Sequence, residues 1–350
     1  MFAVNFTGKN YNRTVIPLTM AGSELEIARS MAFPTIGVVL LGGITDQNQR
    51  VPMHNSAGIT YSDKSRSIRT VTSLYISEKR EGYFNGNKIT PDNSYRSPFR
   101  IIEKYENMIF DRLKIEGKNR FLCFKSENHG ILSGSSDSGA AALGKCIQSI
   151  LGDELDMVRF ENDLRSVSES VGRSFYGGLT VTETDRKTAV TKTISDWSAF
   201  NDFTIVGCPF PEPRKPSDII HENIVKSSVY EDRVNTAKER VKELERLVKE
   251  GRIEKIFEMA QRDTEDYHAL IESVGVRIIN PAMRNFMDKI KSSQSKFWST
   301  YIVTGGTNVF VICHNEDLGK VMDIAELNTL KPVALKVSPG ASSLAKSTSV

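Results

Sequence analysis

The segment Gly130-Ile-Leu-Ser-Gly-Ser-Ser-Asp-Ser-Gly139 carries the strongest structural and chemical signal in the chain. It follows Phe121–Phe124, a short apolar run that predicts a strand, and leads into Ala140–Leu143, a run of strong helix formers. The unpaired N–H groups and the dipole at the start of a helix favour phosphate, and serine hydroxyls add donors. The segment therefore predicts a phosphate-binding loop. From spacing alone, a serine- and glycine-rich loop that only caps a helix fits equally well.

Motifs and composition exclude several classes of protein. The sequence has neither the GxxxxGK[ST] motif of P-loop NTPases nor the GxGxxG fingerprint of dinucleotide-binding enzymes. The formal net charge is +3 and the basic residues are spread along the chain, so we expect no nucleic-acid partner. No segment approaches the roughly 20 apolar residues that span a bilayer, and the first residues lack a secretory signal. We therefore expect a cytoplasmic protein without a membrane partner. The four cysteines and five histidines are scattered, which fits a reducing compartment and predicts no zinc-type site.

Apolar patterns along the chain predict a mixture of strands and helices. Short apolar runs predict strands at residues 36–41, 71–76, 82–84, 121–124, 189–194, 203–206, 301–303 and 309–313. Helical periodicity predicts helices over residues 98–113 and 230–250. It also predicts one helix through Phe160, Leu164, Val167 and Val171, closed by Gly177-Gly178. Four prolines between residues 207 and 218 predict a linker or an active-site loop.

The predicted organisation is two domains with short terminal segments, and no internal repeat is found. Residues 1–30 are predicted to be an N-terminal extension, and residues 31–205 an N-terminal domain that contains the phosphate loop. Residues 206–340 are predicted to be a C-terminal domain. Residues 341–350, rich in small and polar residues, are predicted to be a disordered tail.

Four segments resemble, in the same order, the motifs of one enzyme family. Ser126-Glu-Asn128 followed by Gly134–Gly139 resembles the phosphate-binding motif of GHMP kinases, and specifically that of mevalonate diphosphate decarboxylases. Pro34–Gly43 resembles the first strand of that family, Val167–Gly178 its carboxylate-binding helix, and Tyr301–Asn308 a late strand. The resemblance covers about residues 30–340. It implies a two-domain α+β fold of the GHMP kinase type, with a ferredoxin-like C-terminal domain and a substrate cleft between the domains.

The sequence departs from the decarboxylases where they hold the charges that drive decarboxylation. The family has a lysine at the position of Leu40 and an aspartate at the position of Thr304, whereas the family's arginine is retained as Arg173. The tyrosine and second lysine that hold the 5-diphosphate in the family are absent, because Leu41 and Ile44 occur in that strand. Phosphoryl transfer depends mainly on positioning and on neutralising phosphate charge, so it can survive these losses. The pattern resembles the archaeal mevalonate 3-kinases, which stop at the 3-phosphate.

The resemblance implies roles for individual residues. Arg173 would clamp the substrate carboxylate, Glu169 would accept a substrate hydroxyl or orient Arg173, and Thr304 would lie opposite the reacting hydroxyl; with Ser136 these form the predicted catalytic set. The predicted substrate-binding set comprises Leu40, Leu41, Glu169, Arg173 and Thr304. The predicted nucleotide-binding set comprises Gly130, Ser133, Gly134, Ser135, Ser136 and Ser138. Without the resemblance, Glu169 and Arg173 lie four residues apart on a predicted helix face and fit a surface ion-pair ladder with Arg165.

Cofactors, partners and weaker candidates complete the expectations. ATP and Mg²⁺ follow from the chemistry, mevalonate is the expected substrate, and the family suggests a homodimer; the sequence identifies no Mg²⁺ ligand. Asp263, Thr264 and His268 match a family motif loosely, and a histidine on a helix face is more often structural. Ser217 and Asp218 either fold over the nucleotide or cap a helix.

Three functions remain open from the sequence. The first is phosphorylation of the 3-hydroxyl of mevalonate without decarboxylation, and the second is decarboxylation of a phosphorylated mevalonate. The third is an inactive metabolite-binding protein with a kinase fold, against which the intact serine loop argues.

Overall fold

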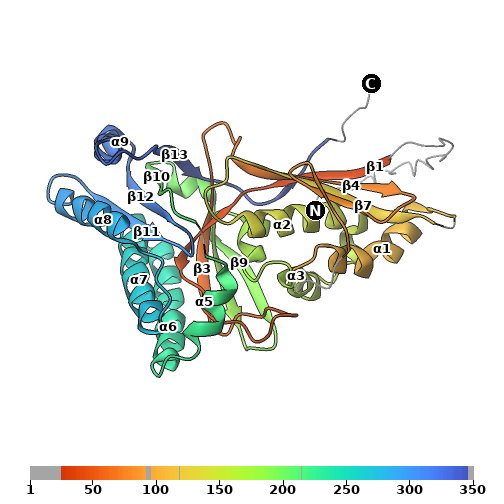
Figure 1. Cartoon of the computed structure of the whole chain (residues 1–350), viewed down its shortest axis with the longest axis horizontal. Coiled ribbons are helices and arrows are strands. Elements are labelled where there is room, and N and C mark those ends of the chain that lie inside the picture. The colour runs from red at the N-terminus through yellow and green to blue at the C-terminus, as the bar shows by residue number, and fades with distance from the viewer. Residues whose placement is uncertain (1–24, 92–95, 118, 214, 346–350) are drawn as a thin grey trace, which may run out of the picture.

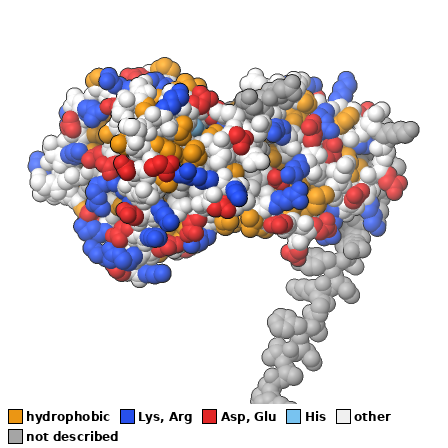
Figure 2. Space-filling model, turned by 90° about the horizontal axis from the view of Figure 1, so that it is seen from below, with side chains coloured by type: hydrophobic (Ala, Val, Ile, Leu, Met, Phe, Trp, Pro, Cys, Tyr) orange, Lys and Arg blue, Asp and Glu red, His pale blue; other side chains and the backbone are white. Residues whose placement is uncertain are grey.

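The computed structural model describes residues 25–91, 96–117, 119–213 and 215–345, in which helices and sheets are mixed (Figure 1). This confirms the α+β prediction. A space-filling view shows two lobes, each bearing basic and acidic side chains (Figure 2). No helix in the described ranges is long and apolar enough to cross a membrane.

A six-stranded sheet forms most of one lobe (Figure 1). Its order is β14-β1-β4-β7-β5-β6, and the β5–β7 pair is parallel whereas its other pairs are antiparallel. The strands are β1 (Leu25–Ala32), β4 (Arg69–Ser77), β5 (Gly82–Phe84), β6 (Asn87–Ile89), β7 (Phe121–His129) and β14 (Ser342–Ser343). One hydrophobic core joins this sheet to four helices. They are α1 (Phe99–Leu113), α2 (Ser135–Leu151), α3 (Met157–Arg165) and α4 (Val171–Tyr176).

An eight-stranded sheet extends through the rest of the molecule in the order β11-β12-β10-β13-β3-β8-β9, with β2 paired to β3. Its strands are β2 (Thr35–Val39), β3 (Ser56–Ser62), β8 (Leu179–Thr184), β9 (Ala189–Ser195), β10 (Phe203–Pro209), β11 (Ser299–Val303), β12 (Asn308–His314) and β13 (Val333–Val337). The remaining helices are α5 (Ser217–Ile224), α6 (Tyr230–Lys249), α7 (Ile253–Ser273), α8 (Pro281–Ser293) and α9 (Leu318–Leu327). Short 3₁₀ turns occur at Gly152–Glu154, Trp197–Phe200 and Asn315–Asp317.

The second sheet is covered by helices on both faces. Successive residues of a strand point to opposite faces. Along β12, Phe310 and Ile312 belong to the core shared with α6, whereas Val309 and Val311 belong to the core shared with α8 and α9. Figure 1 shows α7 and α8 beside the strands β11 and β12, and α6 contacts β2, β3 and β9. The strands that carry candidate site residues therefore lie on a rigid, doubly buried support.

The secondary structure differs from the predicted organisation at three boundaries. Residues 25–30 are not part of an extension, because Leu25–Ala32 pairs with β4 as strand β1. The start of the predicted disordered tail has regular contacts, since Ser342 and Ser343 pair with β1 and the Leu344 N–H donates to the carbonyl of Arg29. The domain boundary at 205/206 falls inside β10. Residues 1–24 and 346–350, which complete the two predicted terminal segments, lie outside the described residues.

The single helix predicted through Phe160 and Val171 is also wrong. The structure ends α3 at Arg165 and begins α4 at Val171, with a turn between them. The Arg165 guanidinium replaces a helical hydrogen bond by donating to the carbonyl of Glu169 at 2.5 Å, and the Ser168 hydroxyl turns away to Asp137. Side-chain donors thus satisfy the backbone and polar groups that a continuous helix would have bonded internally.

We expect substitution of Arg165 to destabilise the fold strongly. Arg165 is fully buried and donates to the buried carboxylate of Glu161 and, at 2.9 Å, to the hydroxyl of Thr191. Arg165→Met leaves Glu161 buried without its cation, which should lower the free energy of unfolding by about 3–5 kcal/mol in urea denaturation. Arg246→Met is the control, because the ion-pair partners of Arg246 among the described residues are exposed glutamates, and this change should leave stability nearly unchanged. Equal losses in the two variants would contradict this reading.

Candidate active site

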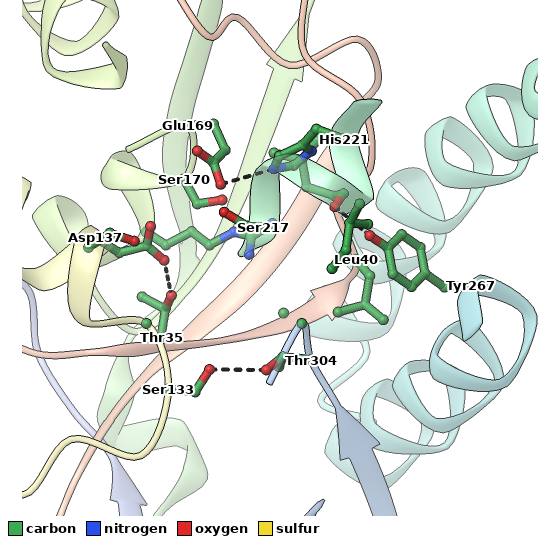
Figure 3. Close-up of a pocket in the computed structure, with 17 residues that line it drawn as sticks. Thr35, Leu40, Ser133, Asp137, Glu169, Ser170, Ser217, His221, Tyr267 and Thr304 are labelled. Atoms are coloured by element: carbon green, nitrogen blue, oxygen red, sulfur yellow. Dashed lines mark hydrogen bonds and ion pairs between the residues drawn. The ribbon is translucent and has the colours of Figure 1, made fainter. Parts of the chain in front are cut away.

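A pocket between the two halves of the chain collects most of the residues predicted from the sequence (Figure 3). Its lining comes from the end of β2, the start of α2, the turn before α4, the helices α5 and α7, and the loop after β11. The predicted residues that line it are Leu40, Leu41, Ser133, Gly134, Ser136, Glu169, Arg173 and Thr304. The structure therefore brings the retained arginine and both substituted family positions to one place.

Three residues of the predicted sets lie elsewhere, and so does Ile44, which stands at the position of the family's second lysine. The Ser138 hydroxyl is fully buried and lies 2.6 Å from that of Thr70, so its side chain faces the core instead of the pocket. Gly130 is at the exposed turn after β7, and Ser135 lines a separate apolar cavity next to α2. Ile44 is not in the pocket lining either; it forms an isolated β-bridge with Pro52.

The phosphate loop has a backbone that requires glycine at its centre. Gly134 has φ +76°, and a Cβ there would lie 2.5 Å from the backbone nitrogen of Thr35. Helix α2 begins at the next residue, so its first turn, with Ser136 and Asp137, borders the pocket. A helix N-terminus at the edge of a pocket is suited to an anionic ligand.

One buried tyrosine fixes this loop to the second sheet. The Tyr61 hydroxyl accepts from the Ser133 N–H and donates to the Ser133 carbonyl, both at 2.8 Å. The Ser133 hydroxyl then lies 3.0 Å from that of Thr304, so the loop is joined to the late strand. Asn308 adds a second bond at the same place by donating to the carbonyl of Leu132 at 2.8 Å.

Arg173 presents a buried guanidinium to the pocket. Its Nε and Nη2 have no hydrogen-bond partner among the described residues, although the side chain is buried. Gly37 and Gly58 lie opposite each other in the β2–β3 pair, and a Cβ on Gly58 would be 2.6 Å from Arg173 Cδ. Burial lowers the pKa of Arg173, and the charge of Asp137 opposes that shift. A guanidinium that lies between two glycine-lined strands and keeps unused N–H donors is suited to bind a planar anion such as a carboxylate.

Glu169 has different partners from those expected. It lies in the turn before α4, and its Oε2 accepts from Arg50 Nε at 3.1 Å, Arg50 Nη2 at 2.9 Å and Arg96 Nη2 at 3.0 Å. Its Oε1 lies 3.1 Å from His221 Nε2. Burial would raise the pKa of Glu169, but His221 and the two guanidinium groups hold it well below its usual range. The surface ion-pair ladder is therefore wrong, and Glu169 has no direct bond to Arg173 among the described residues.

Asp137 was missed by the sequence analysis. Its carboxylate accepts from the hydroxyls of Thr35 and Ser168, the latter at 2.5 Å, and it borders the pocket beside Arg173. Burial raises the pKa of Asp137, and the charge of Arg173 opposes this. The available signal was its position: it is the one carboxylate within the serine loop itself.

The pocket wall at Leu40 and Leu41 is held through its backbone. The Leu40 N–H donates to Asp263 at 2.7 Å, and Tyr267 donates to the carbonyl of Leu41 at 3.0 Å. Arg233 in turn binds both Asp263 and the carbonyl of Leu40. Asp263 is therefore a structural residue that ends β2 and fixes the wall.

Two weaker candidates on α7 are structural as well. His268 bonds the carbonyl of Val303 through Nε2 at 3.0 Å, and burial lowers its pKa to about 4, so the ring is neutral. Thr264 accepts from the N–H of the same Val303. Both residues support the strand that carries Thr304, and neither lines the pocket.

Ser217 and Asp218 form part of the site boundary. Ser217 lines the pocket and accepts from Arg96 at 3.1 Å, and Asp218 pairs with Arg50 at 2.6 Å. Helix α5 begins after Pro216 without a side-chain cap bond, so the capping alternative does not hold. Among the described residues no group of three or more His, Cys, Asp or Glu side chains is arranged to hold a metal ion.

Comparison with known proteins gives the family. A model of the mevalonate-3-kinase C-terminal domain matches residues 215–319, and one of the diphosphomevalonate decarboxylase-like N-terminal domain matches residues 32–193. The mevalonate-3-kinase of Picrophilus torridus is 46% identical over 295 residues, which cover 84% of this chain and 90% of that protein. This chain belongs to the mevalonate 3-kinase family. The mevalonate 3-kinase of Thermoplasma acidophilum is 42% identical over 312 residues, covering 89% of this chain and 96% of that family member.

Solved structures agree with the fold. The Thermoplasma acidophilum mevalonate-3-kinase, solved with mevalonate 3-phosphate and ADP bound, has a TM-score of 0.85 at 42% identity and covers 91% of this chain and 97% of its own. The mevalonate diphosphate decarboxylase of Staphylococcus aureus has a TM-score of 0.76 at 16% identity, covering 92% of this chain and 99% of its own, which shows the fold alone. The GHMP kinase fold and the recognised family are thus confirmed.

We expect Tyr61→Phe to weaken use of the nucleotide while the protein stays folded. The substitution keeps the ring that packs against Phe310 but leaves the N–H and carbonyl of Ser133 without the phenol hydroxyl. The loop should lose its fixed conformation, and kcat/KM for ATP should fall by about tenfold or more. Tyr105→Phe is the control, since it also removes a phenol bond, to Asp163, but lies outside the pocket lining. Unchanged ATP kinetics in Tyr61→Phe would remove Tyr61 from this role.

Proposed function

We propose that this chain is a mevalonate 3-kinase, which transfers the terminal phosphoryl group of ATP to the 3-hydroxyl of mevalonate without decarboxylation. The observation that carries the proposal is the guanidinium of Arg173, whose Nε and Nη2 have no hydrogen-bond partner in the described part of the chain and which shares one pocket with Leu40 and Thr304. The arginine can bind the substrate carboxylate, whereas the leucine and threonine supply no charge for its loss. Membership of the mevalonate 3-kinase family supports the same conclusion.

The nucleotide has room next to the serine loop. An apolar cavity of about 330 Å³ lies beside α2, and Ser136 borders both this cavity and the pocket. Phe84, Phe124 and Leu143 contribute apolar surface to the cavity, which suits a flat purine base. The phosphates of ATP would then extend over the first turn of α2 toward the pocket. This arrangement places the terminal phosphoryl group near the substrate hydroxyl.

Phosphoryl transfer in this pocket is a matter of positioning and charge. A magnesium ion would be held mainly by the phosphates, with Ser136 and Asp137 as the oxygen-bearing side chains of the loop at the pocket. When bound, the ion neutralises charge on the phosphoryl group. Arg173 orients the substrate through its carboxylate. Thr304, whose hydroxyl lies 3.0 Å from that of Ser133, would lie opposite the reacting 3-hydroxyl.

The residues that line the pocket support a reaction in which the substrate keeps its carboxylate. None of the lining residues, all within the described ranges, is a lysine, and Thr304 occupies the position of the family's aspartate. Decarboxylation after phosphorylation needs these charges to drive departure of the 3-phosphate. The pocket offers instead an apolar wall and a neutral hydroxyl. The homodimer and the cytoplasmic location expected from the sequence stay predictions.

The test of this function is product analysis after incubation with ATP and mevalonate. Formation of ADP and mevalonate 3-phosphate without carbon dioxide supports the 3-kinase, both products together support a decarboxylase, and neither product supports an inactive binding protein. Arg173→Ala should lower kcat/KM for mevalonate by about a thousandfold, the loss of a charge-assisted bidentate contact in a desolvated site. Arg173→Lys keeps the positive charge but lacks the two parallel N–H donors of the guanidinium, so it should recover only part of the lost kcat/KM. Turnover of the Ala variant within a few-fold of wild type would show that Arg173 does not clamp the carboxylate.

Substrate choice gives a second prediction. Leu40 and Leu41 offer no hydrogen bonds to phosphate oxygens, and burying a doubly charged phosphate against them has a large desolvation cost. The ionised carboxylate of Glu169 would repel a 5-phosphate, whereas it can accept a hydrogen bond from a free 5-hydroxyl. We therefore expect kcat/KM to be highest for mevalonate among mevalonate, its 5-phosphate and its 5-diphosphate, measured under one set of conditions. Preference for either phosphorylated form would overturn this assignment while leaving the kinase activity possible.

A further inference from the structure

The two oxygens of the Glu169 carboxylate are used unequally. Three N–H groups from Arg50 and Arg96 donate to Oε2, at 2.9 to 3.1 Å. Among the described residues, His221 is the one hydrogen-bond partner of Oε1. A carboxylate has about four acceptor positions in total, two on each oxygen. Oε1 therefore keeps capacity to accept one more hydrogen bond, and Glu169 lines the pocket.

The tautomer of His221 follows from its surroundings. Its Nδ1 lies 3.1 Å from the backbone nitrogen of Gly43, a group that can only donate. Nδ1 must therefore accept, and in the neutral ring the proton is on Nε2, which donates to Glu169 Oε1. His221 is 4% exposed, so both bonds are shielded from water. The ring thus connects the backbone beside the apolar wall to the one carboxylate oxygen with spare capacity.

We infer that His221 is a positioning residue that aims Glu169 Oε1 at the 5-hydroxyl of the substrate. The inference rests on the proposed function, in which mevalonate is the substrate and Glu169 accepts from its free 5-hydroxyl. Arg50 and Arg96 hold the other oxygen and keep the carboxylate ionised. His221 fixes the rotation of the carboxylate about its terminal bond, because it is the contact that Oε1 makes. Selection of a free hydroxyl at the 5-carbon therefore depends on a residue that need not touch the substrate.

A purely structural role of His221 makes a different prediction. Its bond to Gly43 attaches helix α5 to the segment after Leu41, and loss of that attachment would disturb the whole pocket. All substrates would then be affected alike. The two roles use different nitrogens of one ring, so they can be separated by substitution.

Asparagine and glutamine replace the two nitrogens one at a time. The terminal amide of asparagine is two bonds from Cβ, as Nδ1 is, so His221→Asn can accept from Gly43 but does not reach Glu169. The amide of glutamine is three bonds from Cβ, as Nε2 is, so His221→Gln can donate to Oε1 but leaves the Gly43 N–H without this acceptor. The two variants carry the same amide group, and they differ in the distance of that group from the backbone.

The experiment compares mevalonate with 3-hydroxy-3-methylpentanoate, which lacks only the 5-hydroxyl. For each enzyme, kcat/KM is measured by ADP release with both substrates, and the inhibition constant of the analogue replaces its kcat/KM if turnover is too slow. Wild type should prefer mevalonate. His221→Asn should lose about 10- to 100-fold on mevalonate, the range for one hydrogen bond to a charged group, and less than about threefold on the analogue. His221→Gln should retain the wild-type preference, and KM for ATP should be unchanged in both variants.

The outcomes separate this inference from the function on which it rests. An equal loss on both substrates in His221→Asn would show a structural role, and no loss on mevalonate would show no role; each result overturns the inference. Loss of the preference in His221→Gln would do the same, which keeps the test decisive if His221→Asn does not fold. If wild type releases mevalonate 3-phosphate but shows no preference for mevalonate over the analogue, the inference fails and the kinase assignment survives. If wild type forms no mevalonate 3-phosphate, both fail.

Discussion

Buried charge is the constraint on which this site depends. An ionised group removed from water is costly unless another charge or hydrogen bond compensates for it. In the described part of the chain, Glu169 has Arg50 and Arg96, and Asp263 has Arg233 and Arg240. The Nε and Nη2 of Arg173 differ, because among the described residues they have no hydrogen-bond partner, although the charge of Asp137 acts on the same guanidinium. Arg173 therefore keeps hydrogen-bonding capacity that an anionic ligand in the pocket could use.

This constraint also explains how the site can share a fold with decarboxylases and omit their second step. The similarity to the Staphylococcus aureus enzyme extends over nearly the whole chain at 16% identity, so the fold itself does not specify the chemistry. By the motif resemblance, the difference is the charge expected at a few pocket positions, notably those of Leu40 and Thr304. Asp263 accepts from the backbone N–H of Leu40, and the Thr304 hydroxyl lies 3.0 Å from that of Ser133. The same framework can therefore present a charge or an apolar surface.

Local patterns predicted the framework well and the long-range contacts poorly. The strand at residues 82–84, the loop that leads into a helix at Ser135 and the helix starting at Tyr230 follow from glycine and apolar spacing, and the structure confirms these elements. Sequence reasoning could assign Arg173, Leu40 and Thr304 to one site because each lies in a segment that resembles a motif of the family's active site. The partners of Glu169 could not, since Arg50, Arg96 and His221 are 119, 73 and 52 residues away in sequence. The interrupted helix before Val171 was missed for the same reason: its side-chain donors look like ordinary helix residues in the sequence.

The segment from Leu40 to Gly43 has a consequence for how this pocket can be altered. Its backbone is bonded by side chains from other elements: Asp263 and Arg233 at Leu40, Tyr267 at Leu41, and Tyr230, His54 and His221 at the two glycines. These bonds hold the path of the chain through its backbone, whereas at Gly43, with φ +93° and a Cβ position 2.2 Å from the Tyr230 hydroxyl, a side chain would be strained. Leu40 and Leu41 are themselves buried, and Leu40 belongs to the core that includes Ile220 and Tyr267. Exchange of either leucine for a polar residue would therefore keep the backbone anchors, but the new polar group would need a partner inside the pocket wall.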